Sequence, residues 1–500
     1  MAQTVIVGGG IAGLSAGIYS LLSGSEATVV ESHSKAGGNL TAWKRGGYTI
    51  DNCIHWLTGT NPQTKSYKMW CELGALGGVS VYQPELLYSF EKSGERVSLW
   101  RDLNKTELDM LRVSEEDEAQ TKELISAVRA VWDIMGIGPA GNNERLSAAQ
   151  KIKKGKKLLK YHFLSTGALA QRFKSPVLKG FIRGLMGDDF TSLALIIVFA
   201  NFTADNGGIP EGASGSMADR ITQRFLSLGG ELRLGRAVVR INTESGHATG
   251  VTLADGAFIP CDDLIITADP KTVFGKMLRA PMPRSMKKMY TDPRSYRFSS
   301  LHCAFAVNSE KLAFKGDLIL EIPYKYRPAL NSKYIVLREF SHEKFAPEGK
   351  QVLQSMCFVR EESCEAFIAL KKSEGAYRKM KAGLAEIMEL IITEKFEALR
   401  GKLSVIDVWT PATYKRFVGT ELGSYMSFVF PTRRLPSRIK NKLSGFDNIY
   451  FATQWTRAPG GLPISAAEGK RCAELIAQKR EKAALEKAGR KQKNVGGASV

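Results

Sequence analysis

A glycine-rich turn close to the N-terminus has the spacing that binds the diphosphate of a dinucleotide. The β-branched run Thr4–Val7 is followed directly by Gly8-Gly9-Gly10-Ile11-Ala12-Gly13, a G-x-G-x-x-G pattern. In such a pattern Gly8 permits a tight turn, Gly10 lets a diphosphate approach the backbone, and Gly13 lets the strand pack closely on the next helix. The free N–H groups and the positive dipole end of that helix attract phosphate. These residues therefore predict diphosphate binding at the turn.

Glu31 completes this unit and narrows the choice of dinucleotide. The small and apolar residues of 11–22 predict a packed helix, and Ala27–Val30 predicts a second strand that ends at Glu31. An acidic residue about 20 positions after the glycines can accept hydrogen bonds from a ribose diol, and its charge repels a 2′-phosphate. The expected ligand is FAD or NAD rather than NADP.

A glycine pair near the C-terminus is also suited to close contact with a ligand. Trp455 and Arg457 precede Gly460-Gly461-Leu462-Pro463, and the pattern of 465–478 predicts a helix. The two glycines allow close backbone approach, and Pro463 fixes the chain at the start of the helix. If the dipole of that helix is directed at a flavin ring, it stabilises the negative charge that reduction places on the ring.

Three motifs in this order resemble those of the phytoene desaturase and carotenoid isomerase family of FAD-dependent oxidoreductases, which includes the retinol saturases. They are the N-terminal turn with Gly37-Gly38-Asn39 after it, the mid-chain segment 207–270, and the closing segment 448–463. The resemblance implies that FAD is the cofactor and that the backbone at Val238 contacts its adenine ring. By this resemblance the FAD-binding residues are Gly8, Gly10, Gly13, Glu31, Gly37, Gly38, Asn39, Val238, Trp455, Gly460, Gly461, Leu462 and Pro463.

The same resemblance implies a redox enzyme that acts on carbon–carbon bonds of an apolar polyene or lipid-like substrate. The reaction is desaturation, saturation or isomerisation, with an electron acceptor or donor that the sequence does not identify. Two alternatives share parts of the pattern: a flavin amine oxidase, and a non-enzymatic prenyl-lipid carrier of the GDP-dissociation-inhibitor type. The chain departs from the family pattern at Ala213, where a glycine is usual, and at Thr453 and Gln454, where many related flavoproteins have Gly followed by an acid.

The candidate catalytic residues are those that the motifs place beside the flavin ring. His55 and Trp56 follow Asp51, and Arg457 lies in the closing motif. His55 can exchange a proton or polarise a substrate group, and Trp56 can wall an apolar slot. His302 and Tyr296 are further candidates. The pattern predicts no metal site, because the seven cysteines are scattered, without a C-x-x-C pair or a nearby histidine at ligand spacing.

The distances between the motifs predict an α/β fold in which a Rossmann-type FAD-binding domain is assembled from discontinuous segments. We expect this domain to comprise 1–90, 205–275 and 445–478, with an inserted α+β substrate domain. Residues 91–204 have helical spacing and form a helical insertion, whereas 276–444 have several strand-like runs and form the substrate domain. Residues 479–500 are expected to be a basic, flexible tail.

Charge is the strongest feature of the overall composition. The 500 residues include 70 Lys plus Arg against 50 Asp plus Glu, a formal net charge of +20. Six lysines fall within Lys151–Lys160, followed by apolar side chains, which suits an anionic membrane surface as well as a solvated helix face. No nucleic-acid motif accompanies them, so nucleic acid is not an expected partner. Without an export-type N-terminus or a spanning segment, we expect a cytoplasmic protein, peripheral on the inner face of the membrane if the lysines bind lipid.

Overall fold

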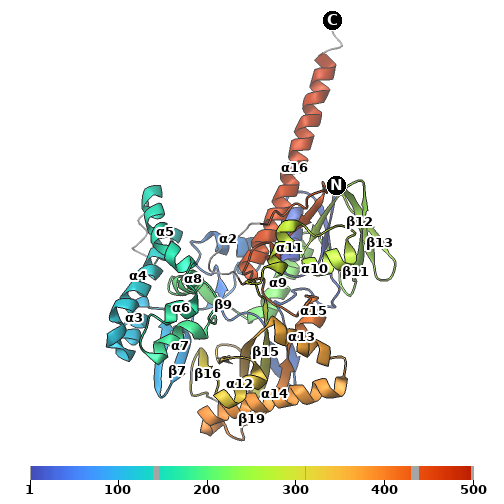
Figure 1. Ribbon diagram of the computed structural model, residues 1–500. Coiled ribbons are helices and arrows are strands. Elements are labelled where there is room, and N and C mark those ends of the chain that lie inside the picture. The colour runs from blue at the N-terminus through green and yellow to red at the C-terminus, as the bar shows by residue number, and fades with distance from the viewer. Residues whose placement is uncertain (1, 139–145, 310, 430–438, 497–500) are drawn as a thin grey trace. The chain divides into compact units, whose positions relative to one another are not determined.

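The structure is a computed structural model that describes residues 2–138, 146–309, 311–429 and 439–496 (Figure 1). Segments that are far apart in the sequence form two compact units. Unit 1 comprises Met1–Gly38, Ala218–Lys288 and Arg438–Val500, and unit 2 comprises Asn39–Met217 and Met289–Ser437. Residues 39–90 thus group with unit 2, whereas we expected them in the cofactor domain. The predicted assembly of an α/β cofactor domain from discontinuous segments is confirmed.

A five-stranded parallel sheet is the centre of unit 1. Its strand order is β10-β2-β1-β14-β20, so that the N-terminal strand lies in the middle and sequence-distant strands flank it. Val5 and Ile6 of the central strand are fully buried, as expected for a strand covered on both faces. The strands are β1 (Gln3–Val7), β2 (Glu26–Val30), β10 (Glu231–Arg233), β14 (Asp263–Ile266) and β20 (Ile449–Phe451).

Helices α1 (Ile11–Leu22) and α16 (Leu462–Gly496) pack against each other in unit 1. Their contact is close because Gly469 has no side chain: a Cβ there would lie 2.3 Å from the carbonyl oxygen of Ala12. The hydroxyl of Ser15 donates a 2.7 Å hydrogen bond to the carbonyl of Ala466. A small antiparallel sheet of β11 (Val238–Glu244), β12 (His247–Leu253) and β13 (Phe258–Pro260) completes the unit.

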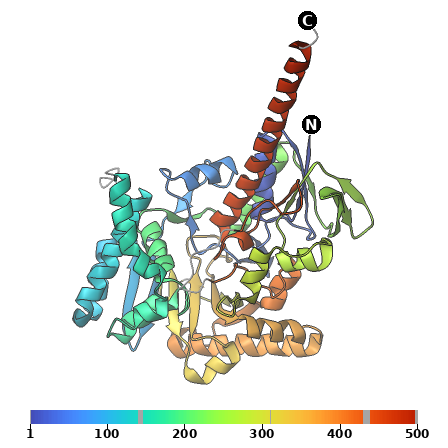
Figure 2. The ribbon, with the colours of Figure 1, turned by 45° about the horizontal axis from the view of Figure 1, so that its top comes forward.

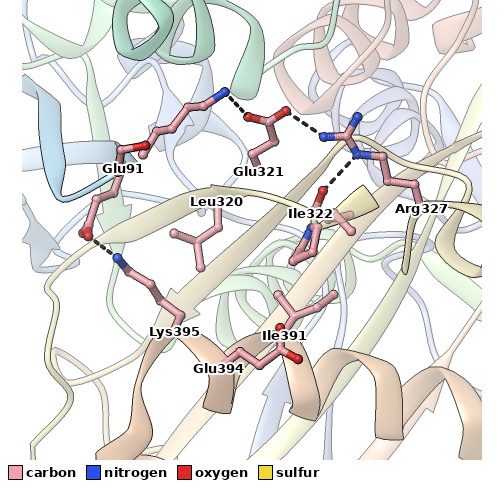
Figure 3. A pocket seen from close by; sticks show the side chains of 11 residues that line it. Glu91, Leu320, Glu321, Ile322, Arg327, Ile391, Glu394 and Lys395 are labelled. Atoms are coloured by element: carbon pink, nitrogen blue, oxygen red, sulfur yellow. Dashed lines mark hydrogen bonds and ion pairs between the residues drawn. The ribbon is translucent and has the colours of Figure 1, made fainter. Parts of the chain in front are cut away.

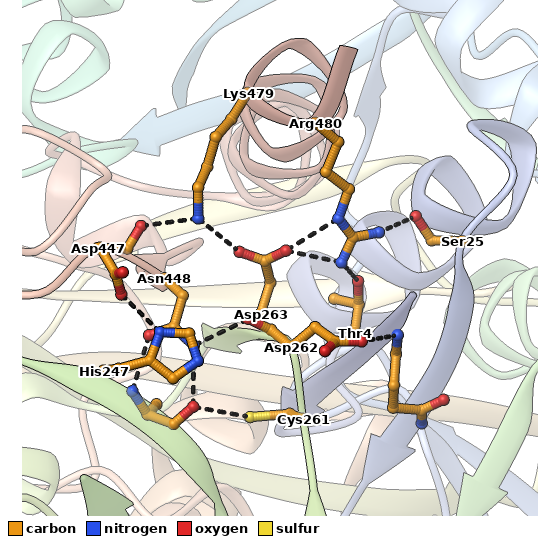
Figure 4. A network of polar contacts seen from close by, with 12 residues as sticks. Thr4, Ser25, His247, Cys261, Asp262, Asp263, Asp447, Asn448, Lys479 and Arg480 are labelled. Atoms are coloured by element: carbon orange, nitrogen blue, oxygen red, sulfur yellow. Dashed lines mark hydrogen bonds and ion pairs between the residues drawn. The ribbon is translucent and has the colours of Figure 1, made fainter. Parts of the chain in front are cut away.

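The C-terminal segment that we expected to be a flexible tail is the continuation of α16. The helix runs without a break from Leu462 to Gly496, and its second half extends beyond the other elements of unit 1 (Figures 1 and 2). Arg480 and Lys479 bond to the buried carboxylate of Asp263, at 2.6 and 3.4 Å (Figure 4). Residues 479–496 are therefore helical, with Lys479 and Arg480 bound to unit 1, and residues 497–500 lie outside the described residues.

Unit 2 is built on a seven-stranded sheet that joins two parts of the sequence. The strand order is β19-β15-β18-β17-β16-β7-β8, and only the β16–β7 pair is parallel. Both predicted insertions, 91–204 and 276–444, therefore contribute to one sheet rather than to separate bodies. The strands are β7 (Leu86–Lys92), β8 (Glu95–Trp100), β15 (Phe298–Val307), β16 (Asp317–Glu321), β17 (Tyr334–Glu339), β18 (Gln351–Arg360) and β19 (Leu403–Trp409).

Alternate residues of this sheet enter two different cores. Phe90 and Ile319 pack with the helices of the first insertion, whereas Leu318 and Leu320 pack with α14 (Glu374–Lys395). Successive side chains of a strand point to opposite faces, so both faces of the sheet are covered. The helices of the first core are α3 (Leu103–Val113), α4 (Glu118–Met135), α5 (Ala148–His162), α6 (Thr166–Ala170), α7 (Pro176–Gly184) and α8 (Ser192–Phe202).

Shorter elements connect these layers. Ala213, at the start of α9 (Ala213–Ser227), has a φ of 45°, so the chain keeps the left-handed conformation that the glycine of related sequences favours. No helix among the described residues is both long and apolar enough to cross a membrane. The remaining elements include β3 (Ala42–Arg45), β4 (Tyr48–Asp51), β5 (Leu57–Thr58), α2 (Lys65–Glu72), β6 (Val81–Tyr82), β9 (Gly207–Pro210), α10 (Pro270–Thr272), α11 (Arg284–Thr291), α12 (Arg327–Leu330), α13 (Glu361–Leu370) and α15 (Pro411–Val418).

Candidate functional site

The predicted glycine turn connects β1 to α1 at the carboxyl end of β1, the central strand of the parallel sheet. A Cβ on Gly13 would lie 1.9 Å from the carbonyl oxygen of Gly8, so only glycine fits between the strand and the helix. Gly10 is different, because a Cβ there would meet nothing nearer than the Cα of Gly38, at 3.9 Å. Among the described residues, no side chain caps the N-terminus of α1, which leaves its first N–H groups for a ligand.

Glu31 lies beside this turn, at the end of β2. Its Oε2 accepts a 2.6 Å hydrogen bond from the Gly9 amide, and its Oε1 accepts from the His33 amide and the Ser32 hydroxyl at 2.8 and 3.1 Å. A carboxylate can accept about four hydrogen bonds, so three leave room for a ribose hydroxyl. The Arg236 amide donates to the backbone oxygen of Glu31 at 2.8 Å, which brings the start of β11, at Val238, to the same region of unit 1.

The Gly37-Gly38 pair lies against the turn. The Gly37 amide donates a 2.8 Å hydrogen bond to the carbonyl of Gly9, and Gly37 forms a parallel bridge with Gly10. A Cβ on Gly38 would lie 3.2 Å from the Cα of Gly10. The glycine turn, the Glu31 carboxylate and the Gly37-Gly38 backbone therefore meet at the uncapped end of α1, and these residues fit the diphosphate and ribose of FAD.

The closing motif forms the turn that starts α16. Trp455 is buried in a single 3₁₀ turn, Gln454–Thr456, and the Gly461 amide donates to the side-chain oxygen of Gln454 at 3.3 Å. A Cβ on Gly461 would meet no described atom within 4 Å, so the backbone is open toward a ligand there. Leu462 and Pro463 begin the helix, whose dipole then points along this opening.

Arg457, a predicted catalytic residue, has its guanidinium in an ion pair. Its Nε lies 2.7 Å from Oε1 of Glu468, whose side chain is only 3% exposed. Oε2 of Glu468 accepts a 2.9 Å hydrogen bond from the Thr456 hydroxyl and another from the Asn441 side chain. This buried carboxylate therefore ties the closing turn to α16, and Arg457 contributes to that anchor.

Asn39, also a predicted cofactor residue, lies in unit 2. Its Nδ2 donates a 3.2 Å hydrogen bond to the backbone oxygen of Tyr425, but its Oδ1 is buried and has no partner among the described residues. A buried acceptor without a donor is unfavourable, typically by about 1–3 kcal/mol. Such an atom fits a side chain that receives a hydrogen bond from a bound group.

His55, the first predicted catalytic residue, belongs to a charged cluster in unit 2. Its Nδ1 lies 2.7 Å from Oδ2 of Asp317, at the start of β16. Arg338 of β17 lies 3.5 Å from the other carboxylate oxygen and donates a 2.6 Å hydrogen bond to the carbonyl of Ile54. Because the carboxylate can only accept, Nδ1 carries the proton and Nε2 keeps its lone pair.

Asp51 adds a second carboxylate to this cluster. It accepts 2.7 Å hydrogen bonds from both the amide and the hydroxyl of Ser214, at the N-terminal end of α9, and a 3.2 Å bond from the Cys53 amide. The Ser214 hydroxyl in turn accepts from the Ile54 amide at 2.8 Å. The backbone before His55 is thereby fixed from two sides.

Burial decides the protonation of these groups. It lowers the pKa of His55, and the positive charge of Arg338 lowers it further, although Asp317 acts in the opposite direction. Burial raises the pKa of Asp51 in spite of the Arg338 charge and the Ser214 hydrogen bonds. His55 is therefore a neutral imidazole at neutral pH, with one nitrogen available as a proton acceptor.

A hydrogen-bonded network of aromatic residues lies along β15 and β19. The Tyr414 hydroxyl is 3.1 Å from Nε2 of His302 and donates to Oδ1 of Asn52 at 2.9 Å. Trp409 also donates to Asn52, at 3.0 Å, and stacks on His302 with ring centroids 4.5 Å apart. Burial holds the pKa of His302 well below its ordinary value, and repulsion from His55 when that ring is protonated and from the Arg338 charge lowers it further. The network is therefore uncharged.

An aromatic core cluster adjoins this network. Tyr425 lies 5.8 Å from the Tyr414 ring and 5.6 Å from Phe298, which packs edge-on against Phe358 at 5.3 Å. Trp56, the predicted pocket residue, is partly buried against the helical core of unit 2. Phe298 is buried, and Phe358 and Tyr425 are partly buried, so these rings form a small aromatic core cluster next to the polar groups of unit 2.

A cavity of about 420 Å³ in unit 2 is separate from this cluster (Figure 3). It is lined at the far end of β16 by Leu320 and Glu321, whereas Asp317 stands at the start of the strand, about 13 Å away by strand geometry. Most of its charged residues are paired with one another, as Lys92–Glu321 and Arg327–Glu321 show. The cavity is not the place where His55 could act.

Several residues of the cluster were missed from the sequence. Arg338 lies inside the apolar strand pattern of β17, and Asp317 begins that of β16. Asn52 directly follows Asp51 in the sequence. A charge within a strand that is buried on both faces needs a partner, and that signal could have drawn attention to Arg338. Its partners lie 284 and 21 residues away at Ile54 and Asp317, so the pairing itself required the fold.

Known proteins share this architecture and sequence pattern over almost the whole chain. Prolycopene isomerase of Daucus carota is 22% identical over 95% of this chain and 80% of its own length. The 4,4′-diaponeurosporene oxygenase of Staphylococcus haemolyticus is 20% identical over 95% of this chain and 97% of its own. The predicted resemblance to carotenoid-related flavoproteins is confirmed.

Structural comparison supports the same fold. The crystal structure of an oxidoreductase from Methanosarcina mazei covers 95% of this chain and 99% of its own with a TM-score of 0.60, at 16% identity.

The sequence pattern of the family described as flavin containing amine oxidoreductase matches residues 11–477, from the first helix to the closing one. The chain therefore belongs to the flavin containing amine oxidoreductase family and is an FAD-dependent oxidoreductase.

Proposed function

We propose that this enzyme acts on carbon–carbon bonds of an apolar, polyene or lipid-like substrate, by desaturation, saturation or isomerisation. The observation that carries the proposal is the partly buried aromatic cluster of Phe298, Phe358 and Tyr425 beside an uncharged hydrogen-bonded network. An extended apolar chain gains free energy by burial against such rings and needs no charged partner. The names of the two relatives, a prolycopene isomerase and a diaponeurosporene oxygenase, agree with this substrate class.

FAD is held, in this proposal, by the residues that the sequence predicts. The turn from Gly8 to Gly13 takes the diphosphate, Glu31 takes the ribose, and Val238 lies at the adenine. The closing turn from Trp455 to Pro463 holds the remaining part. Asn39, whose unpartnered oxygen lies in unit 2, stays a cofactor residue predicted from the family resemblance. When bound, the flavin supplies a hydride acceptor or donor.

His55 is the proposed proton-transfer residue. Desaturation removes two hydrogens from adjacent carbons, one as hydride and one as a proton, and the proton needs an acceptor. The neutral His55, with Nδ1–H bound to Asp317, offers Nε2 for this purpose, and saturation would use the same atom in reverse. Asp317 and Arg338 are positioning residues, because they act through the imidazole.

Trp56 and Arg457 have different parts in the proposal. Trp56 contributes apolar surface next to His55, with ring centroids 6.3 Å apart. Arg457 is the weaker candidate for contact with the reacting atoms, because its Nε is already bound to the buried Glu468. We assign it to holding the closing turn in place.

An anaerobic assay separates this proposal from oxidation of amines, which the family description favours. The FAD-loaded protein is mixed with polyenes in liposomes or with primary amines, while the visible flavin absorption and the products are followed. We expect altered polyene products, with loss of flavin absorption for desaturation, and none with amines. Bleaching by an amine together with unchanged polyenes would refute the proposal. His55→Gln should retain bound FAD and lose turnover.

A further inference from the structure

Helix α5 presents an apolar stripe to solvent on the side opposite to its buried face. Ile152, Leu159 and Phe163 are 61%, 47% and 48% exposed and are spaced by seven and four residues, which places them on one face. Leu158 and Tyr161, on the other side of the helix, are buried and face the core with α4 and α8. A solvated helix face normally has no such stripe, because exposed apolar area is unfavourable in water.

The helix is dense in positive charge and has no acidic residue. Six lysines fall between 151 and 160, of which Lys154 pairs with Asp133 and Lys160 with Glu123. The other four make no ion pair with any described residue: Lys151, Lys153, Lys156 and Lys157. Lysines beside an apolar stripe can reach the phosphates of a bilayer while the stripe enters its interface.

The helix is held in this orientation by its own cap and by the packing of its buried face. The Ser147 hydroxyl accepts from the Gln150 amide at 3.2 Å, and the Gln150 side chain accepts from the Ser147 amide at 2.8 Å. The geometry points to α5 with Phe163 as a docking surface for an anionic lipid bilayer. This inference does not rest on the reaction proposed above, although it would bring the enzyme to apolar substrates.

The test is sedimentation of the full-length, FAD-loaded protein with vesicles. Vesicles of phosphatidylcholine with phosphatidylserine are compared with vesicles of phosphatidylcholine alone, at low and physiological salt. Each lysine near an anionic surface contributes about fivefold in partitioning. Four lysines together could contribute up to about 600-fold, so the variant K151Q/K153Q/K156Q/K157Q should bind anionic vesicles at least about tenfold more weakly than the wild type, even if only two of them reach the surface.

A matched control removes the same charge elsewhere on unit 2. Lys311, Lys315, Lys372 and Lys379 are also exposed, so K311Q/K315Q/K372Q/K379Q should bind vesicles nearly as the wild type does. A second variant, I152S/L159S/F163S, keeps every lysine and should also lose about tenfold, because the apolar stripe contributes separately. Bound-flavin absorption and circular dichroism check that each variant is folded.

Three results would overturn the inference. Equal loss in the α5 and control lysine variants would assign binding to net charge alone. If both α5 variants sediment with vesicles as the wild type does, the lysines form only a solvated helix face and do not bind lipid. Binding of duplex DNA through the same four lysines, without binding to vesicles, would replace lipid by nucleic acid as the partner.

Discussion

The two regions to which we assign cofactor binding and proton transfer are built in different ways. In unit 1 the cofactor region consists mainly of backbone: glycines at the start of α1 and of α16, with Glu31 beside them. In unit 2 the reactive region consists of side chains, such as His55, Asp317 and Arg338, that come from a loop and two strands. The first therefore depends on what side chains are absent, and the second on which charges are paired.

This difference predicts how each region fails. A cofactor region made of glycine backbone tolerates little added volume, but replacing one of these glycines leaves no charge without a partner. A buried charge cluster tolerates small changes of volume, but removal of one charge leaves the others without a partner. The predictions below test this contrast.

Removal of a charge from unit 2 should have the largest effect. In Arg338→Gln, the carboxylates of Asp317 and Asp51 lose their buried cation. We expect the free energy of unfolding to fall by about 4 kcal/mol. Urea denaturation measures this change, with Lys379→Gln as an exposed control. A loss below about 1 kcal/mol would mean that the charges of unit 2 are compensated in another way.

Added volume in unit 1 should have the next largest effect, and only at one of two glycines. Gly13→Ala places a Cβ against the Gly8 carbonyl and should lower stability by about 3 kcal/mol. Gly10→Ala, its matched control, meets open space and should change stability by about 1 kcal/mol or less.

Gly10→Val sharpens the same contrast at the level of the cofactor. Because the position is open in the chain itself, the variant should fold, but its side chain would occupy the place of the diphosphate. We expect a protein with wild-type circular dichroism and no bound yellow colour. Retention of flavin in this variant would show that the diphosphate does not bind at the turn.

A variant of Arg457 tests whether the closing turn is as sensitive to a change of charged partner as the His55 cluster is. Its side chain is 43% exposed, so Arg457→Lys should cost only about 1 kcal/mol after solvent screening. A positioning role predicts weaker FAD binding with kcat nearly restored at saturating FAD. A fall in kcat with unchanged FAD affinity would instead make Arg457 catalytic.

Mild acid should produce the smallest change, and it should come from unit 2. Folding keeps the pKa of His302 and of His55 below that of an unfolded histidine, which is about 6.5. As the pH falls through this value, the unfolded chain binds protons that the folded chain does not, so stability decreases. Asp51 acts in the opposite direction, because burial raises its pKa and the folded chain then binds a proton that the unfolded chain does not.

The check is the melting temperature between pH 7 and 5.5. The decrease should be smaller in His302→Gln than in the wild type, because one buried imidazole is gone. His247→Gln is the control, since the His247 side chain is 44% exposed. An equal pH dependence in all three proteins would exclude a contribution from His302.

Much of unit 1 could be predicted, because its signals are local. The strand, turn, helix and acid from Thr4 to Glu31 lie where the pattern places them, and Gly37 returns to Gly9. The end of α16 could not be predicted, because Arg480 and Lys479 look like a charged tail until Asp263 is seen beneath them (Figure 4). Similarly, nothing local shows that 91–100 and 317–321 share a sheet.

The sequence by itself determined the cofactor turn and the family, since a phosphate-binding loop is written in consecutive residues whose backbone freedom is fixed by glycine. Only the tertiary structure decided the environment of His55. The partner Asp317 lies 262 residues away, and burial, which sets the direction of the pKa, exists only after the sheet has formed. Local backbone geometry is a property of neighbouring residues, whereas charge pairing and desolvation are properties of the folded whole.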